Sequence, residues 1–314
     1  MSIDKRMIPF PCREAQVFAK QTAGLVRRLK AIGCKDVVIG LSGGLDSTLV
    51  LLVAHAAFGK LKLDKSGIHL YTMPGFGTTK RTKGNAEKLA EGLGLKCETI
   101  GIAKACRQHF KDIGHDGLTP DITFENAQAR MRTLILFSKA NMFNALNLGT
   151  GDMSEEALGW CTFGGDQIAH FNINSGVPKT VVRKVCAWWA KRNPGAAAEA
   201  IQDIIATPIS PELIPGQVTE KTVGPYELHD FFLWNLVMNK LRPAALLKAA
   251  SAYFAGRFGE EEIAATLEIF VRRFFTQAFK RNAAPDGIKV FPFELGPRGY
   301  YIPSDMGIPK AYRM

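Results

Sequence analysis

Residues 37–50 read VVIGLSGGLDSTLV, a β-branched run that passes through a glycine-rich turn into an apolar segment. This order predicts a buried strand, a tight loop and a helix. Gly43 and Gly44 let the backbone turn sharply and bring N–H groups close to a ligand. The following helix start adds unpaired N–H donors and the positive end of its dipole. The segment therefore predicts a phosphate-binding loop at the edge of an α/β sheet.

The polar residues of this loop indicate a metal–nucleotide complex. Hydroxyls of Ser42, Ser47 and Thr48 can donate hydrogen bonds to phosphate oxygens. Asp46 would repel phosphate alone, but it fits a Mg²⁺ ion that bridges protein and phosphates. The alternative is an ordinary strand-to-helix turn in which Ser47 caps the helix. The loop lacks the Lys of the Gly-x-x-x-x-Gly-Lys pattern and does not match Gly-x-Gly-x-x-Gly.

The charge balance favours anionic ligands. The 314-residue chain carries 40 Lys and Arg against 29 Asp and Glu, a formal net charge of +11. Such a balance attracts either small polyphosphates or nucleic acid. A nucleic-acid surface needs clustered cations. The sequence hints at two short clusters, formed by Lys60, Lys62 and Lys65 and by Lys80, Arg81 and Lys83. We therefore expect small-molecule ligands and no nucleic acid.

Cysteine usage and the N-terminus bear on the compartment. The 6 cysteines are scattered, without a Cys-x-x-Cys pair, which is typical of a reducing compartment and argues against structural zinc. The first residues lack the apolar stretch of a signal peptide, and no run approaches the roughly 18 apolar residues that cross a membrane. We expect a cytoplasmic protein without membrane contact.

Hydrophobic periodicity predicts strands that alternate with helices. After the first strand, we expect strands at 67–73, 97–100 and 145–148, and a polar loop between the third strand and the helix that follows it. The expected helices are 10–31, the segment up to 59, 82–93, 124–141, 181–192, 226–240, 244–258 and 260–280.

This alternation indicates a doubly wound, parallel α/β sheet covered by helices on both faces. We predict a single domain over residues 1–314, with the core sheet at about 35–180, a helical part at about 181–280 and a loop-like tail at 281–314. Ligands of such sheets bind beyond the carboxyl ends of the strands, where the three informative loops of this chain fall together.

Several motifs carry a resemblance to known families. The Ser-Gly-Gly-x-Asp-Ser loop resembles that of the N-type ATP pyrophosphatases, which transfer AMP from ATP to a carbonyl or carboxylate. Other stretches resemble NAD synthetase, specifically the synthetase half of its long, glutamine-dependent form, across roughly residues 15–305. These stretches are 73–85, 123–132, 148–155, 157–162, 177–180, 210–213, 224–230, 279–281 and 285–287.

The resemblance implies an ATP and magnesium site. Asp46 and Glu155 match the family's magnesium ligands, and Lys179 matches a phosphate contact that offsets charge on the leaving pyrophosphate. Glu155 and Lys179 can alternatively be solvated surface groups, and Ser210 a turn or cap serine. The implied ATP-binding residues are Gly40, Ser42, Gly43, Gly44, Leu45, Asp46, Ser47, Thr150, Lys179 and Ser210.

The resemblance also implies a deamido-NAD site. Asn126 and Arg130 lie four residues apart on one helix face and can reach one ligand. Asp166 matches the acidic residue beside the nicotinic ring and can orient ammonia, so the implied catalytic residues are Asp46, Lys179 and Asp166. Ordinary surface pairs, a turn aspartate and solvated side chains are the alternatives. The implied deamido-NAD-binding residues are Asn126, Arg130, Asp166, Lys280, Arg281 and Asp305, with Ser304 beside them.

The implied protein is a ligase with the adenine-nucleotide α-hydrolase fold, acting as a homodimer. It makes NAD from deamido-NAD, ATP and ammonia, with Mg²⁺ as cofactor and an adenylated intermediate, by positioning and electrostatics. The long form carries a glutaminase ahead of this region, and since this chain begins shortly before its first strand we expect that domain to be absent. Two residues depart from the family pattern: Lys80, where an acidic residue is common, and Glu156, where an apolar one is.

Other functions remain open. A related pyrophosphatase acting on another carboxylate or on tRNA fits the positive charge, although the missing Cys-x-x-Cys pair counts against tRNA thiolation. A catalytically silent nucleotide-binding module, or the synthetase partner of a separate glutaminase, is a second alternative. The presence of both Asp46 and Glu155 argues against silence, because a pure binder needs no complete metal pair.

Overall fold

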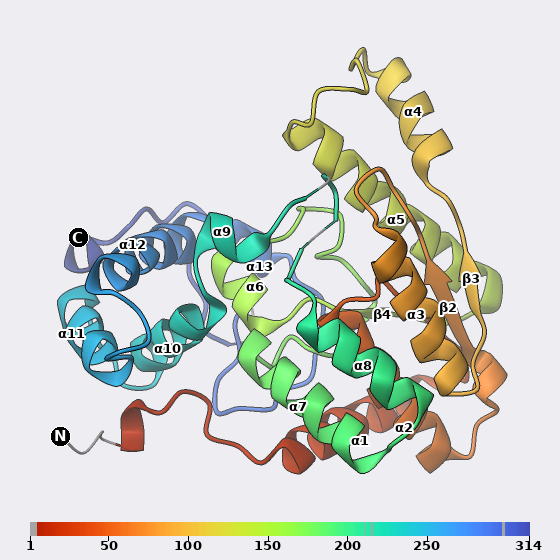
Figure 1. The fold of residues 1–314 in the computed structure, drawn as a ribbon, viewed down its shortest axis with the longest axis horizontal. Coiled ribbons are helices and arrows are strands. Elements are labelled where there is room, and N and C mark those ends of the chain that lie inside the picture. The colour runs from red at the N-terminus through yellow and green to blue at the C-terminus, as the bar shows by residue number, and fades with distance from the viewer. Residues whose placement is uncertain (1–4, 211, 215, 297–298) are drawn as a thin grey trace.

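The computed structural model describes residues 5–210, 212–214, 216–296 and 299–314 (Figure 1). Its centre is a parallel sheet of 5 strands in the order β3-β2-β1-β4-β5. The strands are β1 (Val37–Gly40), β2 (Ile68–Thr72), β3 (Cys97–Thr99), β4 (Leu146–Gly149) and β5 (Phe171–Asn172).

Helices cover both faces of the sheet. The helices of the α/β part are α1 (Glu14–Ile32), α2 (Leu45–Leu61), α3 (Lys80–Gly92), α4 (Ala103–Asp112), α5 (Ile122–Phe143), α6 (Met153–Leu158), α7 (Lys179–Arg192) and α8 (Ala196–Ala206). Side chains of β1 alternate between two cores: Val37 and Ile39 pack toward α1, α2 and α7, while Val38 packs toward α4 and α5. This alternation follows from the two-residue period of a strand.

The strand order places the ligand site. From β1 the chain moves outward through β2 to β3, and it then returns to the other side of β1 to form β4 and β5. The direction of winding therefore reverses between β1 and β4. The loops that leave neighbouring parallel strands on either side of such a reversal diverge and open a crevice. Here those loops are 41–44 and 150–152.

A second group of helices lies to one side of the sheet, at the left of Figure 1. It comprises α9 (Thr219–Val223), α10 (Tyr226–Val237), α11 (Pro243–Tyr253), α12 (Glu260–Thr276) and α13 (Ala278–Asn282). Buried aromatic side chains of α10 and α12, such as Phe232 and Phe270, belong to the same continuous core as the sheet residues Leu148 and Phe171. The short 3₁₀ helices are Lys5–Met7, Lys65–Gly67 and Lys310–Tyr312.

The fold class predicted from the sequence is confirmed, and most predicted elements lie within a few residues of the observed ones. The polar loop expected after β3 is wrong in part, because residues 103–112 form α4. Cys106 and Phe110 lie four residues apart on this helix and are both buried. The tail is irregular as expected, but it contributes Ile288 and Phe291 to the core. Among the described residues, no helix is both long and apolar enough to span a membrane.

Candidate active site

The loop between β1 and α2 turns tightly and is held by its own serine hydroxyls, which accept hydrogen bonds from the Ser42 and Gly44 N–H groups. Gly43 adopts φ +82, a conformation that favours glycine, and an added Cβ would lie 2.1 Å from the carbonyl oxygen of Thr82. The Ser42 and Ser47 hydroxyl oxygens lie 3.0 Å apart, and the Ser47 hydroxyl donates to the Gly44 carbonyl. Ser47 therefore organises the loop and does not cap α2, whose N-cap is Gly44.

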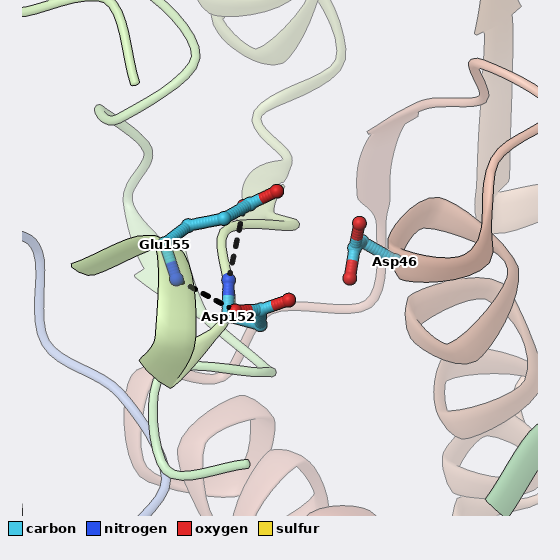
Figure 2. Close-up of side chains that lie close together, drawn as sticks. All are labelled: Asp46, Asp152 and Glu155. Carbon is cyan, nitrogen blue, oxygen red and sulfur yellow. Dashed lines mark hydrogen bonds between the residues drawn. The ribbon is translucent and has the colours of Figure 1, made fainter. Parts of the chain in front are cut away.

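Across the crevice, a capping box sets the start of α6. The Asp152 carboxylate accepts a hydrogen bond from the Glu155 N–H at 2.9 Å, and the Glu155 carboxylate accepts one from the Asp152 N–H at 3.4 Å. Figure 2 shows both bonds and the carboxylate of Asp46, which approaches from the first turn of α2. Ligand oxygens of Asp46, Asp152 and Glu155 lie within 4.8 Å of one another.

The ammonium of Lys179, the first residue of α7, lies among these three carboxylates. Its Nζ is 2.5 Å from Asp46 Oδ2, 2.8 Å from Asp152 Oδ2 and 2.8 Å from Glu155 Oε1. Burial lowers the pKa of Lys179, but the surrounding carboxylates raise it well above its usual value. One cation thus faces three buried or half-buried carboxylates.

The excess negative charge fits a divalent metal ion. Burial raises the pKa of Glu155 to about 7, and it raises that of Asp152 well above its usual value. Oδ1 of Asp46 is buried and has no hydrogen-bond partner among the described residues. Carboxylate oxygens from two separate loops are the donor set that Mg²⁺ accepts. The sequence predicted Asp46 and Glu155 as ligands, and the structure adds to their cluster Asp152, whose spacing to Glu155 is that of a capping box.

The far end of α6 is held by three cations from α12 and α13. Arg273 Nε donates to the Leu158 carbonyl at 2.9 Å, and Lys280 Nζ donates to the Gly159 and Cys161 carbonyls at 3.0 and 2.8 Å. Arg281 Nη1 donates to the Ala157 carbonyl at 3.3 Å. Cations suit the unpaired carbonyls and negative dipole end of a helix C-terminus.

A cavity of about 490 Å³ lies between the two loops. All ten residues predicted to bind ATP line it: they come from the end of β1, the two loops, the starts of α2 and α7, and Ser210 after α8. Glu155 also lines it, so the predicted metal pair faces the same space. The lining ATP set is Gly40, Ser42, Gly43, Gly44, Leu45, Asp46, Ser47, Thr150, Lys179 and Ser210.

Part of the predicted deamido-NAD set lines this cavity as well: Asn126, Asp166 and Lys280. Asn126 Oδ1 accepts a hydrogen bond from the Thr162 hydroxyl at 2.8 Å, and Asp166 Oδ1 accepts one from the Thr162 N–H at 2.8 Å. Burial raises the pKa of Asp166.

The structure places Arg130, Arg281 and Asp305 outside the cavity lining. Arg130 binds the Phe163 carbonyl through Nε and Nη2. Arg281 is 1% exposed, and its guanidinium lies 4.5 Å from the centre of the Phe274 ring. Asp305 is exposed, beyond the cavity. Arg281 is therefore a core residue, in contrast to the sequence prediction.

Sequence reasoning missed Arg132, which does line the cavity. Arg132 Nε donates to the Met73 carbonyl at 3.1 Å. The lining face of α5 includes Asn126, Ala129 and Thr133, at helical offsets of three and seven. This face runs on the opposite side of Asn126 from Arg130, so the i, i+4 relation chose the wrong edge of the helix.

Comparisons with known proteins place this fold and cavity in context. Residues 17–253 match a family described as NAD synthase. The glutamine-dependent NAD(+) synthetase of Mycobacterium leprae is 39% identical over 335 residues, covering 96% of this chain and 49% of that protein. This chain therefore spans about half the length of that curated relative.

Two solved structures share the fold. A glutamine-dependent NAD(+) synthetase from Cytophaga hutchinsonii matches with a TM-score of 0.76 and 19% identity, covering 93% of this chain and 54% of that chain. A glutamine-dependent NAD+ synthetase from Acinetobacter baumannii, in complex with adenosine diphosphate, matches with a TM-score of 0.57 and 22% identity, covering 98% of this chain and 50% of that chain.

Proposed function

Because this chain belongs to the NAD synthase family, we propose that it is a ligase that converts deamido-NAD to NAD with ATP and ammonia. The observation that carries the proposal is the Lys179–carboxylate cluster, which faces the glycine-rich loop across one cavity. This arrangement joins a candidate phosphate-binding loop, a cation and a metal-binding set. The adenosine diphosphate in the Acinetobacter baumannii protein supports ATP as the nucleotide.

In the first step, the loop at 42–47 binds the ATP phosphates through its N–H groups. The nicotinate carboxylate attacks the α-phosphorus, which forms a carboxylate–AMP bond and breaks the bond to pyrophosphate. Lys179 offsets the negative charge that develops on the departing pyrophosphate. Mg²⁺, held by Asp46 and Glu155 with Asp152 beside them, would neutralise phosphate charge when bound.

In the second step, ammonia attacks the adenylated carbonyl carbon and AMP leaves. Asp166 lies in the cavity near Asn126 and Lys280, and its carboxylate can hold the incoming nitrogen and accept a proton from it. Its raised pKa suits such a base. No protein nucleophile is needed, so orientation and charge supply the catalysis.

The nitrogen donor is the feature that most needs a test, because the Mycobacterium leprae relative is named as glutamine-dependent. We propose that the synthetase chemistry of this chain uses ammonia and that any use of glutamine needs a separate glutaminase activity. A purified chain should then release pyrophosphate and form NAD from deamido-NAD and ammonium, with a rate at low ammonium that rises with pH.

The experiment compares deamido-NAD with other carboxylates, each with ammonium or glutamine. Pyrophosphate release only with another carboxylate or with tRNA would assign a different substrate. NAD formation with glutamine by the purified chain alone would contradict the nitrogen assignment. ATP binding without pyrophosphate release in any arm would favour a silent nucleotide-binding module.

We also propose a cytoplasmic homodimer. Leu134 and Met142, eight residues apart on α5, are 60% and 70% exposed, and exposed apolar side chains of this kind can pack against a second copy. Light scattering on the purified chain tests this proposal, and a monomeric mass at micromolar concentration would contradict it.

A further inference from the structure

One sequence motif has no part in the chemistry proposed above. Residues 224–230 begin α10, and Asp230 at the end of the motif is 1% exposed. Asp230 does not line the cavity. A fully buried carboxylate is costly unless several donors satisfy it, so its partners identify what it holds in place.

Within the described part of the chain, the hydrogen bonds that the Asp230 carboxylate accepts come from α6 and α7. Its Oδ1 accepts a hydrogen bond from the Ser154 hydroxyl. Its Oδ2 accepts hydrogen bonds from the Thr180 N–H at 3.0 Å and from the Thr180 hydroxyl at 2.6 Å. Ser154 Oγ in turn accepts a hydrogen bond from the Lys179 N–H at 2.8 Å.

These bonds replace a local cap at the start of α7. The N-cap of α7 is Pro178, which provides no side-chain hydrogen bond to the helix. The first N–H groups of a helix need acceptors, and a negative charge there is favourable to the helix dipole. Ser154 and Asp230 supply these acceptors from other helices. They thereby fix the backbone of Lys179 and Thr180 relative to α6.

The side chain of Lys179 extends from this fixed point into the carboxylate cluster. Its ammonium must lie within hydrogen-bond distance of Asp46 from α2 and Glu155 from α6 at once. A shift of the α7 start relative to α6 would lengthen at least one of these contacts. The ammonium is therefore placed by two helices that Asp230 binds together.

We infer that Asp230 is a positioning residue. By joining the start of α7 to α6, it keeps the Lys179 ammonium where it can meet the pyrophosphate. The inference rests on the proposed function in that Lys179 is the cation that meets the pyrophosphate. It assigns a second task to α10, whose Tyr226 ring centre already lies 5.4 Å from the Lys179 Nζ.

The test variant is Asp230→Asn, which keeps the shape but turns one acceptor oxygen into an N–H₂ donor. That group then faces a hydroxyl or N–H that needs an acceptor. The control is Asn235→Ala on the same helix. Asn235 is also fully buried and donates to the Met7 and Phe231 carbonyls, away from α6 and α7. Thr180→Val, which removes only one donor to Asp230, is a milder second variant in case Asp230→Asn does not fold.

The first measurement needs no activity. Lysine methylation of the ligand-free chain, followed by mass spectrometry, reports how far Lys179 is protected, since its side chain is 2% exposed. Asp230→Asn should increase the labelling rate of Lys179 about tenfold or more through local opening, and Asn235→Ala should leave it near the wild-type rate. Equal labelling in the two variants would overturn the inference, whatever reaction the protein catalyses.

The second measurement is pyrophosphate release. Asp230→Asn should lower kcat by about 10- to 100-fold, as loss of a supporting hydrogen-bond partner does at metal sites, with little change in KM for ATP. In a Lys179→Met background the same change should have no further effect, because the two residues act as a unit. Additive losses, or a kcat loss in Asn235→Ala of similar size, would show that Asp230 serves stability alone. A wild-type chain without pyrophosphate release would refute the proposed function and leave the labelling result to decide on Asp230.

Discussion

At the scale of single residues, Lys179 faces more negative charge than one ammonium can balance. Three carboxylate groups surround it, and Asp46 Oδ1 has no hydrogen-bond partner among the described residues. Such crowding costs stability in the free protein unless a further cation enters. The cluster therefore stores unfavourable electrostatic energy that ligand binding can release.

This balance predicts opposite effects of Asp46→Asn on activity and stability. Removal of one ligand charge should cost several kcal/mol of transition-state stabilisation, so pyrophosphate release should fall by roughly a hundredfold or more. The melting temperature should not fall, because repulsion among the carboxylates decreases. A pyrophosphate-release assay measures the loss of activity, and thermal unfolding measures the melting temperature. Asp64→Asn, at an exposed site away from the cluster, is the control, and near wild-type turnover in Asp46→Asn would contradict the metal assignment.

His229 gives a pH prediction at the same scale. Its Nε2 donates to the Val223 carbonyl at 2.7 Å, whereas its Nδ1 is buried without a partner among the described residues. Burial, together with a smaller effect of the Arg273 charge, lowers the pKa of His229 to about 4. The unfolded chain therefore binds a proton between pH 6.5 and 4 that the folded chain does not. Stability from this group is present above pH 6.5 and is lost as the pH falls.

His229→Gln should remove this pH dependence. Between pH 6.5 and 4, wild-type protein should lose on the order of 3 kcal/mol more unfolding free energy than the variant. Urea denaturation at several pH values measures the difference. Parallel pH profiles of the two proteins would show that His229 is protonated in the folded state.

The residues predicted from the loop motif at 40–47 all line the cavity, and Leu41, which was not in the predicted set, lines it too. Because β1 ends at Gly40 and α2 begins at Leu45, residues 40–47 lie at the carboxyl edge of the sheet and line the cavity.

The structure departs from the prediction at Arg281, which we expected to contact deamido-NAD. Its guanidinium instead donates to the Ala157 carbonyl at the end of α6 and lies in the core beside Phe274. The prediction also left out Asp152, because its burial depends on Lys179 and no local pattern reveals a partner that distant in sequence.

At the scale of elements, the loop after β1 and the first turn of α3 depend on each other. Gly43 lies so close to the Thr82 carbonyl that any side chain there must push the two apart. Gly114 has a similar φ of +75 with nothing within 4 Å of an added Cβ. Alanine at either position pays for the left-handed backbone, but only alanine at Gly43 also meets the Thr82 carbonyl. Comparing the two variants therefore isolates the effect of that contact.

Gly43→Ala should impair nucleotide binding, and Gly114→Ala should not. Both variants should lose about 1–2 kcal/mol of stability from the left-handed conformation. Only Gly43→Ala must also move the loop, which displaces the N–H groups that we propose bind phosphate and should weaken ATP binding at least about tenfold. Calorimetric titration and chemical denaturation measure these quantities. Unchanged ATP affinity in Gly43→Ala would show that the loop does not bind phosphate.

Long periodic elements were predictable, and so were the short apolar strands, but the two short elements α6 and β5 were not. Helices α2 and α5 carry enough periodic or apolar sequence to identify them, and their ends fall near the predicted positions. In contrast, α6 spans only Met153–Leu158, and β5 only Phe171–Asn172. Segments of this length gain most of their stability from tertiary contacts, such as the bonds that hold both ends of α6.

At the scale of the whole molecule, the alternation of strands and helices was sufficient to predict the parallel sheet, and the cavity lies at the sheet edge where we expect ligands. The alternation did not reveal that the C-terminal helices support the site. Asp230 binds the start of α7, and Arg273 binds the end of α6. These contacts span long sequence separations, and only the assembled core makes them close.

The predicted single domain leads to a last expectation, that the sheet and the C-terminal helices unfold together. Phe270 on α12 is fully buried in the core that also contains sheet residues. Phe270→Ala should cost about 3–5 kcal/mol. Cys106 lies on the opposite face of the sheet, in a separate buried cluster, and is also fully buried. If the chain unfolds as one unit, the loss at Phe270 must weaken the protection of Cys106 equally.

Pulsed thiol labelling in urea, with the Cys106 peptide identified by mass spectrometry, measures that protection. In Phe270→Ala, the labelling midpoint of Cys106 should shift by the same urea concentration as the circular dichroism midpoint. The matched core change Phe110→Ala, beside Cys106, should in turn shift a C-terminal probe such as Trp234 fluorescence. A Cys106 midpoint that stays at the wild-type value while helical signal is lost earlier would show two units, with the C-terminal helices able to detach. In that case the contacts of Arg273, Lys280 and Arg281 with the end of α6 would break before the loop at 41–44 unfolds. Activity would then disappear at the lower of the two urea midpoints.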